Sequence, residues 1–141
     1  MAQAPAKAAT PAKRTLAHGV GRRKKSVARV WFKRGKGDIR VNGMDILHYF
    51  DTKFDVETAE TPCRVVAASS NYDMKVTVSG GGKTAQADAV KLAISRALVS
   101  MDETIRPLLR SNNLLTVDDR IKERKKPGQK AARRKFQFVK R

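Results

Sequence analysis

The 141-residue sequence has few of the residues on which disulfide-rich, membrane and metal-binding proteins depend. Its single cysteine, Cys63, excludes an internal disulfide and fits a reducing compartment. No stretch approaches the roughly 18 consecutive apolar residues of a membrane span. Two histidines and one cysteine at wide separations form no recognisable metal site. The sequence therefore predicts no metal and no other cofactor.

Acidic residues are also scarce, and the positive charge lies at the two ends of the chain. Residues 1–40 carry twelve Lys/Arg against one acid, residues 41–119 eight against eleven, and residues 120–141 eleven against one. A solvated surface would mix the two signs. Concentrated positive charge usually needs a polyanion. Nucleic acid fits better than an anionic membrane, because no apolar or amphipathic basic stretch accompanies the charge.

The centre of the fold is predicted in residues 72–101. Residues 72–78 alternate between apolar and polar side chains, as in a half-buried strand. From residue 89 to residue 101 apolar side chains recur every three or four positions, which indicates one face of a long helix. Successive glycines before a helix bring backbone N–H groups together. The three glycines between strand and helix therefore either hold an RNA phosphate or only permit a tight turn: Gly80, Gly81 and Gly82.

The same turn suggests a less favoured alternative, a nucleotide hydrolase with a phosphate-binding loop. Gly82-Lys83-Thr84 ends like such a loop, but the full pattern requires a glycine where this sequence has Thr77. A nucleoside triphosphatase also needs several βα units, and this chain has room for one.

Further elements are expected on both sides of this unit. From Ser26 the sequence alternates as a strand, and the loop at residues 34–37 followed by more alternation predicts a hairpin with a basic outer face. Trp31, on that face, is interpreted as covering the sheet rather than stacking on a base. Asn42-Gly43 indicates a turn before a short helix. Helices are also predicted from a Thr61 N-cap with Pro62 at the first position to about residue 68, and from residue 102 to about residue 112.

The cationic ends are the predicted RNA-binding segments. The first lies between flexible glycines and the first strand, and it comprises Arg22, Arg23, Lys24 and Lys25. The second follows Asp119, where apolar residues are too sparse to form a core. Its cations suit RNA phosphates, and its aromatic residues offer flat faces for bases. The phosphate-binding candidates of this arm are Arg120, Arg124, Lys125, Lys126, Lys130, Arg133 and Arg134.

The expected organisation is a disordered extension (residues 1–18), a globular RNA-binding domain (19–118) and an extended basic tail (119–141).

From about Gly19 to Arg141 the sequence resembles the universal small-subunit ribosomal protein nine family, in its bacterial form. The resemblance is carried by short motifs throughout the chain and by the register of the tail: Gly19 to Lys24, Val41-Asn42-Gly43, Gly80 to Gly82 with Gln86, Ile94 to Leu98, Glu123 to Lys126, Arg133-Arg134 and Lys140-Arg141. It implies a two-layer α/β sandwich, with a mixed sheet, helices on one face and a left-handed βαβ crossover. It also implies a place in the head of the small subunit of the cytoplasmic ribosome, among neighbouring ribosomal proteins and bound to the small-subunit rRNA.

The resemblance further implies that the tail contacts the tRNA in the peptidyl site through Lys140 and Arg141. The chain is thus expected to be a structural protein rather than an enzyme, and a general nucleic-acid chaperone is the main alternative. Four positions depart from the family: Val139 replaces a serine, Phe136 stands where a proline is common, and both Ala85 and Asp88 stand where small glycines are usual. The acid near the helix start weakens the case for a phosphate at Gly80–Gly82.

Overall fold

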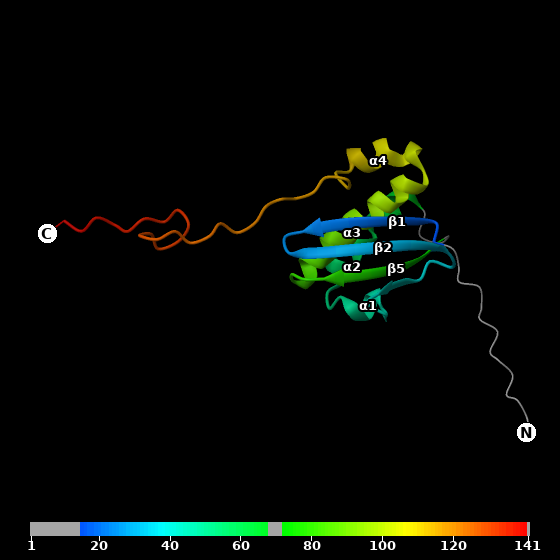
Figure 1. The fold of residues 1–141 in the computed structure, drawn as a ribbon, viewed down its shortest axis with the longest axis horizontal. Coiled ribbons are helices and arrows are strands. Elements are labelled where there is room, and N and C mark those ends of the chain that lie inside the picture. The colour runs from blue at the N-terminus through cyan, green and yellow to red at the C-terminus, as the bar shows by residue number, and fades with distance from the viewer. Residues whose placement is uncertain (1–14, 68–71, 141) are drawn as a thin grey trace, which may run out of the picture.

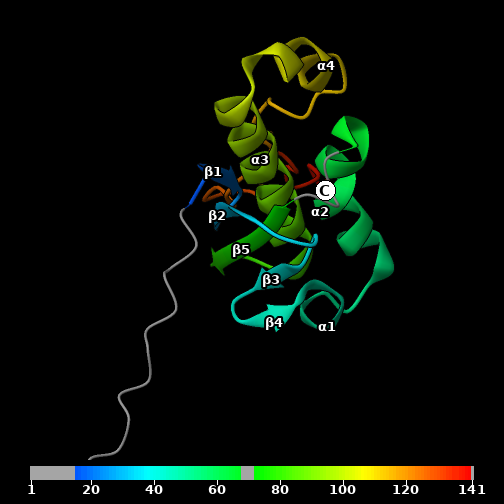
Figure 2. The same cartoon turned by 90° about the vertical axis from the view of Figure 1, so that its right-hand side faces the viewer.

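The computed structural model describes residues 15–67 and 72–140, in two layers. The helices α3 (Lys83–Met101) and α2 (Lys53–Val66) cover one face of a mixed five-stranded sheet, and the other face is open (Figure 1, Figure 2). The sheet has the order β1-β2-β5-β3-β4, and its strands are β1 (Ala17–Arg23), β2 (Ser26–Arg34), β3 (Ile39–Val41), β4 (Met44–Asp45) and β5 (Tyr72–Ser79). The shorter helical elements are α1 (Ile46–Tyr49), a 3-10 turn at Glu103–Ile105, and α4 (Arg106–Ser111). The predicted α/β sandwich is confirmed.

The core lies between the sheet and the two long helices. Alternate residues of β2 and β5 point into it, and Val30 and Val76, which are partners in the antiparallel register, are fully or almost fully buried. The predicted apolar face of α3 packs against them, with Val90 and Ile94 fully buried. The two periods read from the sequence, two residues for the strand and three to four for the helix, therefore meet in one core, as predicted.

Strand β1 lies directly on the backbone of α3, which the sequence analysis did not foresee. A side chain at Gly21 would place its Cβ 2.0 Å from the carbonyl oxygen of Ala89, and one at Gly19 would lie 2.1 Å from that of Ala93. The interpretation of these glycines as flexible was wrong. They are strand residues whose missing side chains let strand and helix approach closely.

The predicted hairpin of β2 with β3 is also wrong, because β5 lies between the two strands. β3 runs parallel to β5, and the actual hairpin is formed by β1 and β2. The loop after Gly35 spans the end of β5 instead of turning back on β2. The Asp73 carboxylate holds this loop by accepting the N–H groups of Lys36, Gly37 and Asp38, at 2.7, 3.3 and 3.4 Å.

Helix α2 begins eight residues earlier than the predicted N-cap at Thr61, and it continues through Pro62. The hydroxyl of Thr61 donates to the carbonyl oxygen of Glu57 at 2.8 Å, one turn back, so this residue lies inside the helix instead of capping it. Burial of Val56, Ala59 and Cys63 on one face outweighs the hydrogen bond that the proline removes. Ala68, the predicted end, lies outside the described residues.

The chain passes from β3 to the parallel strand β5 through α1 and α2, behind the sheet in the view of Figure 1. β5 points left in Figure 1, β3 runs parallel to it, and Figure 2 labels β3 below β5. Because the connection passes behind the sheet, the crossover is left-handed, against the usual hand and as the resemblance implies. In the described residues no helix has the length and apolar character to cross a bilayer.

Candidate nucleic-acid interface

Two turns meet at one end of the sheet, and together they bring most of the predicted cations and glycines of the globular part to one place. The first is the β1–β2 turn at Lys24 and Lys25, and the second is the β5–α3 turn at Gly80–Gly82. A Cβ on Gly80 would lie 2.3 Å from the carbonyl oxygen of Lys25, so the two turns are in contact. We call this region the basic end.

The β5–α3 turn is held in place by hydrogen bonds and close contacts with Ser26 and Gln86. Gly80 and Gly81 have φ of 75° and 65°, values that favour glycine. The Gly80 carbonyl oxygen accepts hydrogen bonds from Ser26 Oγ and Gln86 Nε2, each at 3.0 Å. A Cβ on Gly81 would lie 2.1 Å from Ser26 Oγ, whereas one on Gly82 meets nothing within 4 Å. Close packing therefore requires the first two glycines, and a phosphate at this turn stays a prediction.

A buried polar chain connects this turn to the middle of the sequence. The Tyr49 hydroxyl donates to Gln86 Oε1 at 2.8 Å, and Gln86 in turn donates to Gly80. Asn42 is bound to β5, the strand that leads into this turn. Its Oδ1 accepts the N–H of Val78 at 2.9 Å, and its Nδ2 donates to the Val78 carbonyl oxygen at 3.0 Å. Three of the motif positions, Asn42, Gly80 and Gln86, thus serve to fix the turn.

Lys83, the residue that suggested a nucleotide hydrolase, points at Tyr49. Its Nζ donates to the Tyr49 carbonyl oxygen at 2.6 Å and lies 3.9 Å from the centre of the tyrosine ring. An ammonium group held in this way is not presented to a nucleotide. The geometry opposes the hydrolase interpretation.

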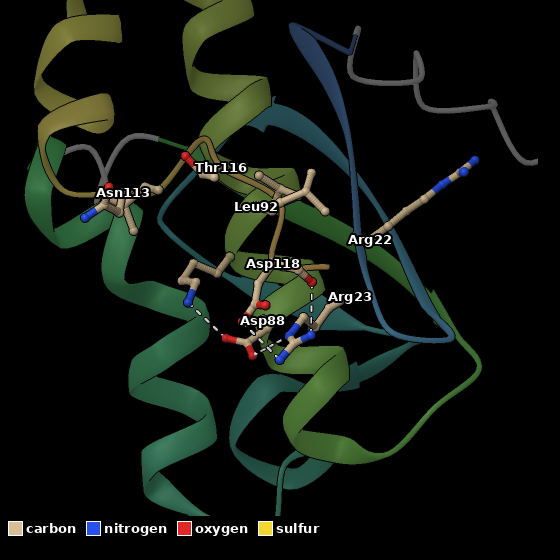
Figure 3. A pocket seen from close by; sticks show the side chains of 10 residues that line it. Arg22, Arg23, Asp88, Leu92, Asn113, Thr116 and Asp118 are labelled. Carbon is tan, nitrogen blue, oxygen red and sulfur yellow. Dashed lines mark hydrogen bonds and ion pairs between the residues drawn. The ribbon is translucent and has the colours of Figure 1, made fainter. Parts of the chain in front are cut away.

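Arg23 differs from the other cations of the first basic segment, because its guanidinium turns inward (Figure 3). Nη1 donates to the backbone carbonyls of Asp118 at 3.0 Å and Arg120 at 2.8 Å. The group also pairs with the carboxylates of Asp118 at 3.0 Å and Asp88 at 3.6 Å, and its side chain is only 12% exposed. Arg23 therefore holds the start of the arm against the globular part.

Asp88 completes this arrangement. It accepts from Lys91 Nζ at 2.9 Å, one turn along α3, and faces Arg23 on the other side. These groups line one side of a cavity of about 380 Å³ between β1, α3 and residues 113–118. In Figure 3 Arg22 points away from the cluster, toward solvent. The acid that replaces the usual family glycine thus pairs with protein cations.

The remaining cations of the basic end are free to meet a ligand. Arg22, Lys24 and Lys25 are exposed, and Lys24 has a φ of 52° in the tight β1–β2 turn. None of the three forms an ion pair within residues 15–67 and 72–140. Their roles in RNA binding stay predictions.

The described part of the arm, residues 119–140, has no helix or strand and extends away from the globular part (Figure 1). Two arginines are paired locally, Arg120 with Asp118 and Arg133 with Glu123. Hydrogen bonds from Arg120 hold the pKa of Asp118 well below its usual value, and the charge of Arg23 adds to this effect. The other eight cations of the described arm form no ion pair among the described residues, and all eight are exposed: Lys122, Arg124, Lys125, Lys126, Lys130, Arg134, Lys135 and Lys140.

Near its end the arm exposes apolar surface beside its charges. Lys130 Nζ lies 5.6 Å from the ring centre of Phe136, and Phe138 is 92% exposed. Lys140 is exposed, while Arg141 lies outside the described residues. Exposed aromatic rings among unpaired cations are what a nucleic-acid ligand would cover.

Comparison with known proteins identifies the family of this chain. The family model described as "Ribosomal protein S9/S16" matches residues 21–141. The chain belongs to the ribosomal protein S9/S16 family. Proteins named "Small ribosomal subunit protein uS9" are similar over most of both chains. Those of Christiangramia forsetii and Cytophaga hutchinsonii are each 48% identical over 88% of this chain and 97% of their own length. That of Chlorobaculum parvum is 52% identical over 86% of this chain and 95% of its own length.

Membership of the S9/S16 family confirms the predicted resemblance, including its bacterial form, since these relatives are bacterial. It also confirms that the chain is a structural ribosomal protein and not an enzyme. The match includes the whole arm, so the arm is part of the family pattern rather than an unrelated appendage.

The inward position of Arg23 was not predicted. Arg23 was expected to bind phosphate together with Arg22, Lys24 and Lys25, but in the structure its side chain holds the start of the arm. The alternation of β1 could have indicated that Arg23 faces the helix, since His18, Val20 and Arg22 point to the other side. The alternation was hard to recognise because the two preceding helix-facing positions are glycines.

Proposed function

We propose that the chain is a structural component of the small ribosomal subunit that binds rRNA through its basic end and its arm. The observation that carries this proposal is the extended arm, whose unpaired cations point into solvent on a segment with no core of its own. Such a segment has too little apolar surface to order itself, and RNA phosphates supply both the countercharge and the surface that it lacks. The relatives named as small-subunit proteins support the same assignment.

We further propose that Lys140 and Arg141 contact the tRNA in the peptidyl site. The geometry supports this, because the arm carries its end far from the globular part (Figure 1) and leaves Lys140 exposed. Contacts of this kind position the tRNA and do not read its sequence. Neighbouring ribosomal proteins and the rRNA would fix where the arm ends.

Sedimentation separates this function from that of a free nucleic-acid chaperone. A subunit component stays in stoichiometric amount on small subunits of the cytoplasmic ribosome after a high-salt wash. A chaperone dissociates, because its binding rests on counterion release alone. Loss of the protein from washed subunits would contradict the proposal.

The tRNA contact has its own test. Removal of residues 139–141 is expected to leave subunit assembly intact and to weaken tRNA binding at the peptidyl site by about tenfold, which corresponds to about 1.4 kcal/mol. The matched control is the double variant Lys122→Gln/Lys135→Gln, which also removes two charges from the arm but leaves its end and the predicted phosphate-binding residues intact. Equal tRNA affinity in the truncated and full-length proteins would remove the role of Lys140 and Arg141.

A further inference from the structure

The face of the sheet that no helix covers is cationic, and it extends well beyond the basic end, with which it shares only Arg22. Its side chains are the outward members of the alternating strands. We define the outer face by six of them: Arg22 on β1, Arg29, Trp31 and Lys33 on β2, Lys75 on β5, and Arg40 on β3. From this arrangement we infer that the outer face is a second RNA-binding surface, on which an RNA strand lies across the sheet with a base stacked on Trp31. The inference rests on the proposed function.

The register places like charges side by side on this face. Lys75 is the partner of Arg40 in the parallel β3–β5 pair and the partner of Trp31 in the antiparallel β2–β5 pair. Cross-strand neighbours are about 5 Å apart, and like charges at that distance destabilise a sheet. An anionic ligand lying over both side chains would remove this repulsion.

None of the five cations of the outer face forms an ion pair within the described part of the chain. Two acids of the strands lie on the same face: Asp73, whose Oδ1 accepts the loop amides of residues 36–38, and Asp45 on β4, the antiparallel partner of Arg40. The five cations outnumber these two acids. The exposed side of the helical layer is different, because it mixes signs. There Arg64 pairs with Glu60 at 3.2 Å and Arg106 with Glu103 at 3.0 Å. Unbalanced charge on one face of the globular part indicates a surface matched to an anion rather than to water.

Trp31 points to RNA rather than to an acidic protein. Its ring lies in the middle of the outer face, partly buried, with the His18 ring centre 5.1 Å away. A nucleobase stacks on such a ring while its phosphates meet the flanking cations, and open sheets bind single-stranded RNA in this way. An acidic peptide would use the cations but has no flat group for the tryptophan. The expected role of Trp31 as a cover for the sheet is compatible with base stacking, because the ring is only partly buried.

Trp31 is the single tryptophan of the chain, so its fluorescence reports this face directly. In a titration of the full-length protein with small-subunit rRNA, we expect quenching of the Trp31 emission at the same concentration at which binding is measured by filter retention. Unchanged emission at saturating rRNA would overturn the inference while leaving rRNA binding, and hence the proposed function, in place. Absence of any rRNA binding would instead contradict the proposed function.

A matched pair of triple variants tests the cations. Arg29→Gln/Arg40→Gln/Lys75→Gln removes three charges from the outer face, and Lys53→Gln/Arg64→Gln/Arg110→Gln removes the same residue types from the helical side. We expect the first variant alone to lose about tenfold or more in rRNA affinity, with the slope of log K against log salt concentration smaller by about 2 to 3. Equal affinity and equal slope in the two variants would contradict the inference.

Two further measurements separate binding from folding and RNA from protein. The outer-face variant should melt near the temperature of the wild type, because loss of the Arg40–Lys75 repulsion offsets loss of the attraction between Arg40 and its β4 partner Asp45. In intact small subunits, crosslinks from a photoreactive group at Lys75 should reach rRNA. Crosslinks that reach only a neighbouring ribosomal protein would assign the outer face to a protein partner and overturn the inference.

Discussion

Arg23 and Asp118 lie 95 residues apart in the sequence and are joined twice. Arg23 Nη1 donates to the backbone carbonyl of Asp118 at 3.0 Å, and Nη2 pairs with the Asp118 carboxylate at the same distance. The first basic segment therefore fixes the point at which the second one leaves the globular part. The two cationic ends are therefore joined, because this contact sets the direction in which the arm leaves the globular part.

Replacing Arg23 with alanine should release the start of the arm. The variant loses two hydrogen bonds to carbonyls and two ion pairs of a side chain that is 12% exposed. We expect a fall in the free energy of unfolding of about 1–3 kcal/mol. We also expect the backbone amides of residues 117–121 to become as mobile as the rest of the arm in ¹⁵N relaxation measurements. Arg22→Ala, which removes the exposed neighbour, is the control; equal amide mobility in both variants would contradict the holding role of Arg23.

The contact of β1 with α3 predicts different effects for two glycine-to-alanine changes. Gly21→Ala places a Cβ 2.0 Å from the Ala89 carbonyl oxygen, and because the Cβ is fixed to the backbone and its partner is a backbone atom, no side-chain rotation relieves the contact. The expected loss in the free energy of unfolding is about 1–3 kcal/mol or more. Gly82→Ala meets nothing within 4 Å and should cost about 1 kcal/mol or less, as an N-cap change. Urea unfolding compares the two, and similar midpoints would show that β1 moves away from α3 easily.

The hydroxyl of Tyr49 should contribute to the stability of the β5–α3 turn. Tyr49→Phe leaves the buried Gln86 Oε1 without its donor, and we expect a loss of about 1–3 kcal/mol in the free energy of unfolding. Tyr72→Phe is the control, because the structure shows a ring contact with Phe32 but no hydrogen bond of the Tyr72 hydroxyl among the described residues. If Tyr49→Phe and Tyr72→Phe lower the free energy of unfolding equally, the hydrogen bond from Tyr49 to Gln86 has no specific stabilising effect.

The buried thiol of Cys63 predicts a specific loss of stability at alkaline pH. Burial raises the pKa of Cys63 from 9.0 to about 12, and the charge of Glu60 adds to the shift. Because the folded state binds this proton more tightly, its contribution to stability is complete below pH 9 and is lost as the pH rises toward 12. The free energy of unfolding of the wild type should therefore fall more steeply between pH 9 and 11 than that of Cys63→Ala. If the free energies of unfolding of the wild type and Cys63→Ala change with pH in parallel, the raised pKa of Cys63 is contradicted.

Several features of the protein followed from the sequence because they depend on local spacing or on composition. The alternation of residues 72–78 and the helical period of residues 89–101 predicted β5 and α3, since each pattern only requires one face to meet the core. The two cationic ends and the near-neutral middle predicted a polyanionic partner. Family motifs supplied the crossover and the ribosomal assignment, which spacing alone does not contain.

Tertiary structure decided the features that depend on contacts between distant segments. Nothing in the local pattern around Gly37 shows that β5 lies between β2 and β3, and nothing near Pro62 shows that burial carries α2 through the proline. Most clearly, Arg23 has the same sequence character as Arg22 and Lys24. Only the packing of β1 on α3, which brings Asp88 and Asp118 to the same place, turns one of these cations inward and leaves the others for RNA.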